Sequence, residues 1–115
     1  MRKIMITVVI LLAVTGCGRI ENLVFIQNNS NVICTTVSIA VCDSSWILEG
    51  MAPGEQHQFT VVYTSDDAFQ ISVETADGGS LSGRFGDVTH GSTGERIRIS
   101  IENDNIFFMQ SGEDN

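Results

Sequence analysis

The stretch FQISVETADGGSLSGRF, residues 69–85, decides the fold. Residues 69–74 alternate apolar and polar side chains, which is the period of a half-buried strand. Asp77-Gly78-Gly79 then supplies the residues that a tight hairpin turn requires. The alternation resumes over residues 81–85 on the far side of the turn. The stretch therefore predicts two antiparallel strands that share one apolar face.

Short β segments continue in both directions from this hairpin. They lie at residues 23–27, 32–41, 46–48, 59–63, 97–101 and 106–109, with turn residues between them. No helical period appears after residue 16. We therefore expect an all-β chain that forms a single antiparallel β-sandwich of about seven or eight strands over residues 23–110. Residues 111–115 would form a polar tail.

Cys34 and Cys42 lie close to the two ends of the longest β segment. Five β-branched residues alternate along that segment and are expected to share one face. They are Ile33, Thr35, Val37, Ile39 and Val41. An oxidising compartment would favour a disulfide between the cysteines. A straight strand would instead hold their Cα atoms roughly 26 Å apart, whereas a disulfide needs about 7 Å or less. The pairing stays open, and a bonded pair would require the strand to bend or break.

The N-terminal residues have the layout of a secretory signal peptide. Two basic residues, Arg2 and Lys3, precede an apolar run over residues 4–14, and small residues then lead to Cys17. This predicts that residues 1–16 are removed and play no part in the fold. The apolar run is too short to span a bilayer, which needs about 20 residues.

Val14-Thr15-Gly16-Cys17 resembles the lipobox of bacterial lipoproteins. The resemblance implies cleavage before Cys17, a diacylglycerol thioether on its sulfur and a fatty acid such as palmitate on its amino group. Residues 17–22 would form the acylated cysteine and a short tether. The next residue is Gly18 rather than Asp, which in the enterobacterial sorting pattern implies the outer membrane, with the domain facing the periplasm or exposed at the cell surface. The alternative is an ordinary secreted protein in which Cys17 is a free thiol.

The chain from Cys17 onward is strongly acidic. It retains four arginines, no lysine and all fourteen Asp and Glu residues, so its formal charge is −10. The 99 residues from Cys17 to Asn115 suffice for one domain and not for two. The balance argues against nucleic acid, whose phosphates need basic neutralisation, and against a polybasic patch for a lipid surface. It is compatible with a solvated face, a basic partner or divalent cations.

Residues 86–94 form the longest predicted loop and the preferred contact surface. Its candidate contact residues are Asp87, Thr89, His90, Ser92 and Thr93. A phosphate cradle would need a lysine and a following helix, and this loop has neither. His90 and Ser92 match no catalytic spacing, so the loop predicts contact rather than catalysis.

The remaining polar residues predict no cofactor. His57 and His90 lie in different segments, so no zinc site is expected. Acidic turns, at Asp66-Asp67, Asp77 and residues 102–105, offer oxygen atoms to Ca²⁺ but lack the EF-hand spacing. Trp46 is expected in the core or at its edge. We therefore expect no metal site, no cofactor and no enzyme.

The order of strands and turns from Phe25 to about Ile106 resembles small bacterial lipoproteins of immunoglobulin-like or transthyretin-like sandwich type. The resemblance rests on Gln27-Asn28-Asn29-Ser30, Met51-Ala52-Pro53-Gly54-Glu55 and Phe69-Gln70-Ile71-Ser72-Val73 with Asp77-Gly78 after it. It implies a lipid-anchored envelope protein that works by non-catalytic protein contact, as a secretion-machine accessory or an immunity-type protein. The alternative is a ligand- or cation-binding envelope module that uses the 86–94 loop and the acidic turns.

Overall fold

The computed structural model describes residues 21–112, and within that range the chain forms eight strands and no helix. The strands are β1 (Asn22–Asn28), β2 (Cys34–Val41), β3 (Ser44–Met51), β4 (Gln56–Val61), β5 (Asp67–Thr75), β6 (Ser80–Val88), β7 (Arg96–Ile101) and β8 (Ile106–Ser111). The all-β prediction is confirmed. The predicted signal peptide and Cys17 lie outside the described residues. No helix in the described range is long and apolar enough to cross a membrane.

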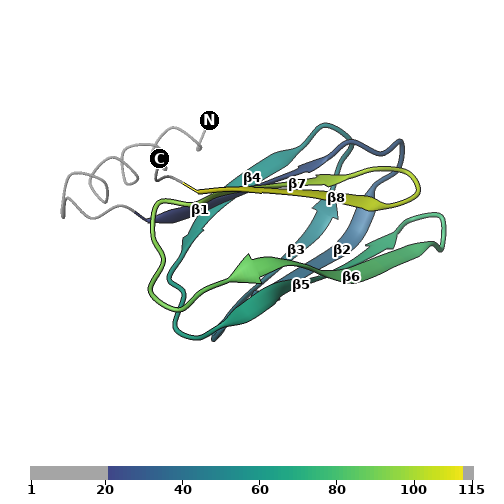
Figure 1. Cartoon of the computed structure of the whole chain (residues 1–115). Coiled ribbons are helices and arrows are strands. Elements are labelled where there is room, and N and C mark those ends of the chain that lie inside the picture. Colours follow the sequence, from purple (N-terminus) through teal and green to yellow (C-terminus); the bar gives the residue numbers. More distant parts are fainter. Residues whose placement is uncertain (1–20, 113–115) are drawn as a thin grey trace.

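The strands form two four-stranded sheets that lie one above the other (Figure 1). Sheet A has the strand order β4-β1-β7-β8, and sheet B has the order β3-β2-β5-β6. The inward side chains of both sheets form one apolar core, which includes Val24, Ile26, Val37, Ile39, Phe69, Ile71, Ile97 and Ile99. Each large apolar side chain buried there contributes roughly 1.5–3 kcal/mol. This shared core holds the two sheets together.

The predicted hairpin is formed by β5 and β6. Phe69 pairs with Phe85, and Val73 pairs with Leu81, so both strands present the same apolar face to the core. The turn closes with a hydrogen bond from the Thr75 N–H to the Gly79 carbonyl, and Gly78 has a φ of 92°. The left-handed backbone at this position explains the glycine.

Sheet A is not entirely antiparallel. β1 runs antiparallel to β4 but parallel to β7, with Val24 opposite Phe59 on one side and Ile97 on the other. The prediction of an antiparallel sandwich is therefore wrong for this pair. Turn signals report only on strands that follow each other in sequence, whereas β1 and β7 are separated by all of sheet B and by β4.

A β-bulge in β2 changes which side chains face the core. The pairing with β5 shifts between Cys34 and Thr36, so Thr35 is an extra residue. Cys34 is buried as a result, while Thr35 and the preceding Ile33 are exposed. The expected single face of residues 33–41 is therefore wrong at Ile33 and Thr35, because one inserted residue reverses the alternation.

The two ends of the sandwich carry different connections. One end, here called the N-terminal end, holds the start of β1 together with the segments before β5 and β7 (Figure 1). The other, the distal end, holds the β5–β6 and β7–β8 turns (Figure 1). Asp66-Asp67 lies at the N-terminal end, whereas Asp77 and residues 102–105 lie at the distal end. The acidic turns are thus divided between the two ends.

Gly86 lies inside β6, in an irregular stretch where Phe85 and Val88 pair with Phe69 and Asp67. Its φ is 82°, and a Cβ added there would lie 2.8 Å from ring atoms of Phe108. Gly78 also has a positive φ, but nothing lies within 4 Å of its added Cβ. Of these two glycines, Gly86 alone combines a left-handed backbone with close packing against the opposite sheet.

We expect Gly86→Ala to lower the free energy of unfolding by about 1–3 kcal/mol more than Gly78→Ala does, because overpacking adds to the backbone strain. Urea unfolding of both variants beside the wild type measures the difference. Equal losses in the two variants would contradict this packing role for Gly86.

Candidate functional site

The predicted contact loop begins later than the sequence suggested. Asp87 belongs to β6, so the loop spans residues 89–95 rather than starting at Gly86. Asp87, Thr89, His90 and Thr93 are exposed, and Ser92 is half-buried. The structure places all five at the N-terminal end of the sandwich. Their role in contacting a partner stays a prediction.

The loop is tied to the body of the domain by backbone hydrogen bonds. The Gly91 N–H donates to the Tyr63 carbonyl at 3.1 Å, and the His90 N–H donates to Asp66 Oδ1 at 2.9 Å. The Ser92 N–H donates to the Thr89 carbonyl at 3.1 Å, which forms a tight turn within the loop. The His90 side chain is left exposed at the edge of this arrangement.

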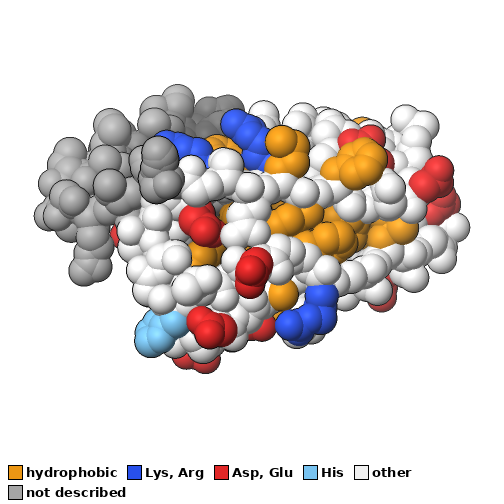
Figure 2. Space-filling view, viewed as in Figure 1, with side chains coloured by type: hydrophobic (Ala, Val, Ile, Leu, Met, Phe, Trp, Pro, Cys, Tyr) orange, Lys and Arg blue, Asp and Glu red, His pale blue; other side chains and the backbone are white. Residues whose placement is uncertain are grey.

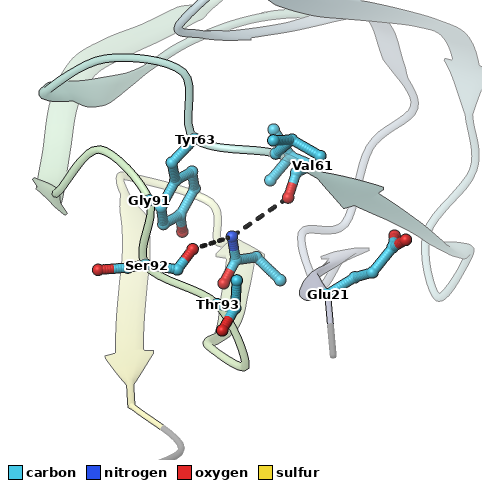
Figure 3. A pocket seen from close by; sticks show the side chains of 8 residues that line it. Glu21, Val61, Tyr63, Gly91, Ser92 and Thr93 are labelled. Atoms are coloured by element: carbon cyan, nitrogen blue, oxygen red, sulfur yellow. Dashed lines mark hydrogen bonds between the residues drawn. The ribbon is translucent and has the colours of Figure 1, made fainter. Parts of the chain in front are cut away.

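Asn22 makes the central contact at this end. Its buried side-chain amide donates to the carbonyls of Val61 and Ser92, at 3.2 and 3.0 Å (Figure 3). Its Oδ1 accepts a 2.9 Å hydrogen bond from the Glu95 N–H. One side chain thus joins the start of β1 to the end of β4 and to both halves of the loop. Asn22 falls within the predicted tether of residues 17–22, but it is the first residue of β1.

A second set of hydrogen bonds closes the gap between the edge strands at this end. Tyr63 Oη and Gln110 Nε2 both donate to Glu95 Oε1 at 3.0 Å. Gln110 also bonds the backbone N–H and carbonyl of Asp87, which links β8 to β6 across the two sheets. Burial, together with the Glu95 acceptor, raises the pKa of Tyr63 well above its usual range, so the hydroxyl remains a proton donor.

The cavity beside Asn22 is small. Its volume is about 70 Å³, and it is bordered by Glu21, the Val61–Tyr63 backbone and the Gly91–Thr93 segment (Figure 3). Pockets for drug-sized ligands are usually about 300–1,000 Å³. The polar groups around it bond to one another, so this arrangement supports the fold of the loop.

We expect Asn22→Ala to lower the free energy of unfolding by about 2–4 kcal/mol, because it removes hydrogen bonds from one buried carbonyl and from a partly buried carbonyl and N–H. Asn29→Ala is the matched control, since the exposed Asn29 amide makes one hydrogen bond, to Ser100. That control should stay within about 1 kcal/mol of wild type. Urea unfolding measures both, and a loss at Asn22 no larger than that at Asn29 would contradict the proposed tie.

Cys34 and Cys42 are both free thiols. Cys34 is buried at the start of β2, and its pKa is raised mainly by burial, which the Ser30 hydroxyl partly offsets. Cys42 lies beyond the other end of β2, in a two-residue turn, with a φ of 55°. Its N–H donates to Asp67 Oδ2 at 2.7 Å, which supports this unusual backbone. β2 continues unbroken between them, so the open question of the pairing resolves to the unbonded state.

We expect a maleimide to modify Cys42 in the folded protein and Cys34 only after unfolding, because the thiolate is the reactive form and Cys34 is buried. A Cys17→Ser background leaves these two thiols as the only ones. Mass spectrometry after timed labelling separates them, with Cys42→Ala as the control that should remain unlabelled when folded. Similar native rates at both thiols would contradict the structure.

The described residues contain no cluster of three or more His, Cys, Asp or Glu side chains arranged to hold a metal ion. His57 lies on β4, and its Nε2 is 2.8 Å from the Glu55 carboxylate. The Ala52 N–H and this histidine lower the pKa of Glu55. Trp46 is half-buried against Phe59, with ring centroids 4.4 Å apart, as expected for a residue at the core edge.

The outer face of sheet A combines exposed apolar side chains with two arginines. Its outward positions are Leu23, Phe25, Gln27, Gln56, Gln58, Thr60, Arg96, Arg98, Ser100, Phe107, Met109 and Ser111. Phe107 and Met109 are 54% and 64% exposed. Figure 2 shows blue and orange side chains along the top of the molecule, above β7 and β8, whereas most red ones lie lower or at the right-hand end.

This face is not among the sites that the sequence predicts. The available signal was the pair of unbroken apolar runs at residues 23–26 and 106–109. A strand with one solvated face alternates, whereas a continuous apolar run indicates that both of its faces are covered. Taken one at a time, the runs predict only ordinary strands, and Arg96 and Arg98 form only the polar half of an alternation.

Comparisons with known proteins identify a similar fold but no family. No protein-family model matches the chain, and no curated protein matches it. Among solved structures, the NMR structure of a protein from Eubacterium rectale is similar, with a TM-score of 0.63 and 16% sequence identity. The match covers 84% of this chain and 96% of that chain. At this identity the likeness supports the fold alone.

Proposed function

We propose that this protein is a lipid-anchored component of the bacterial cell envelope that acts by non-catalytic contact with another protein. The leader and the Val14-Thr15-Gly16-Cys17 motif support the lipid anchor. β1 begins at Asn22, only five positions after Cys17. This tether reaches at most about 18 Å, so the domain would work close to the bilayer. The immunoglobulin-like or transthyretin-like type of sandwich belongs to the same proposal.

The outer face of sheet A is the observation that carries the proposed contact function. Phe, Met and Arg are enriched in the cores of protein interfaces, where Lys, Asp and Glu are depleted. This face has that composition, because Phe25, Phe107, Met109 and two arginines stand on it without a carboxylate at any outward position. It is also continuous, since it is made of four paired strands.

Two classes of envelope protein fit this function, an accessory subunit of a secretion machine and an immunity-type protein that blocks a toxin. The proposed location is the outer membrane, with the domain facing the periplasm; exposure at the cell surface is the alternative. The ligand- or cation-binding module is the weaker proposal, because only Asp66-Asp67 lies at the same end as the contact loop, whereas Asp77 and residues 102–105 lie at the distal end. We propose no catalytic role and no cofactor.

We expect cells fed a fatty-acid analogue to label the wild-type protein and not Cys17→Ser, because the cysteine sulfur carries the diacylglycerol and its amino group is acylated only afterwards. Cys42→Ser is the matched control and should label like wild type. Gel fluorescence after click coupling, with membrane fractionation, provides the measurement. Label retained in Cys17→Ser would refute the anchor.

A further inference from the structure

The outer face of sheet A is organised into rows by the strand register. Arg98 stands between Phe25 and Met109, and the neighbouring row places Ser100 between Gln27 and Phe107. The Arg98 guanidinium carbon lies 5.2 Å from the centre of the Phe25 ring. This stacking holds the cation over an apolar surface without neutralising it. The arginine is therefore oriented before any partner arrives.

Charge is separated sharply between this face and the rest of the domain. Residues 21–112 contain three arginines and twelve Asp or Glu residues, and two of the three arginines stand on this face. Within the described range neither Arg96 nor Arg98 forms an ion pair; the ion pairs there involve His57 and Arg84. The nearby carboxylate of Glu102 lies at the distal edge, where it accepts a hydrogen bond from Ser100.

A shallow depression of about 160 Å³ lies beside Arg98. Phe25, Phe107 and Met109 supply its apolar lining, while Gln27, Gln56 and Ser100 supply hydrogen-bonding groups. The depression is smaller than a pocket for a drug-sized ligand. It fits a single apolar side chain projecting from a larger surface, with polar neighbours around it.

We propose that this face binds an acidic segment of a partner protein, which inserts an apolar side chain beside Arg98 and pairs its carboxylates with Arg96 and Arg98. Charge complementarity carries the choice of partner, because arginine on an apolar surface binds carboxylates with directional hydrogen bonds. The inference rests on the proposed function in one respect, that the protein works by protein contact.

Two other occupants fit the face less well. A second copy docked through a two-fold axis would present the same face, which has no carboxylate at an outward strand position to pair with the arginines. An anionic bilayer would gain only about 1 kcal/mol from each arginine, while the acidic remainder of the domain would be repelled. An acidic protein segment satisfies the arginines and the apolar side chains together.

Site-specific photo-crosslinking in cells that make the full chain tests this proposal. A photoreactive amino acid replaces Met109 in one variant and Ile47 in the other. Both side chains are 64% exposed, but Ile47 belongs to sheet B, so it is the matched control. The adducts are purified from native membranes, and the crosslinked segment is identified by mass spectrometry.

We expect an adduct at position 109 and none at position 47. The partner segment crosslinked to position 109 should contain Asp or Glu beside an apolar residue. Arg96→Gln with Arg98→Gln should lower the adduct yield about tenfold, consistent with the loss of charge-assisted contacts. Arg84→Gln should leave it unchanged, since Arg84 lies on sheet B. Arg98→Glu should abolish the adduct at position 109. Replacing the facing acidic residue of the partner with arginine should then restore it.

Four outcomes would overturn the proposal. Three of them are adducts at position 109 with a phospholipid, with a second copy of this chain, or with residues 113–115 of the same chain. The fourth is an adduct yield at position 109 no higher than that at position 47. None of them changes the fatty-acid label on Cys17. The failure of this inference is therefore distinguishable from the failure of the lipid anchor.

Discussion

The buried amide of Asn22 joins parts of the chain that are far apart in sequence, and sheet A depends on that junction. β1 is a central strand of the sheet, and its first residue bonds to the end of β4 and to the loop that leads into β7. Without the amide, the buried Val61 carbonyl and the partly buried Ser92 carbonyl and Glu95 N–H would each lose a hydrogen bond. The amide therefore fixes the position of β7 relative to β1, where no hairpin turn connects them.

That fixed register has a consequence on the other side of the sheet. The inward side chains of β1 and β7 fill the core, so their neighbours point outward together. Leu23 and Phe25 are then placed beside Arg96 and Arg98. The interface-like face of sheet A is thus a product of the parallel pairing, and the same register that builds the core brings the arginines onto an apolar surface.

Local signals in the sequence predicted the local part of the fold. The β5–β6 hairpin follows from alternation and from Asp77-Gly78-Gly79, and the all-β class follows from repeated short strands. The parallel pair was missed because it is non-local. The sequence does not reveal the bulge at Thr35, because a β-branched run with one inserted residue still looks regular. It predicts a loop that starts at Gly86, because the place of this glycine in β6 depends on Phe108 in the other sheet. The outer face of sheet A required knowledge of which strands are neighbours.

The central place of β1 also governs the order in which the domain can assemble. A chain is synthesised from its N-terminus, so β1 is made before any of its partner strands. The β2–β3 and β5–β6 hairpins of sheet B pair strands that are neighbours in sequence. Leu23 of β1, in contrast, pairs with Arg96 of β7, which is made much later. Non-local pairing of this kind is slow, because the cost of closing a long loop precedes the gain from the contacts. The first strand to be made is therefore among the last to be fully paired, and its apolar run stays exposed until β7 has been made.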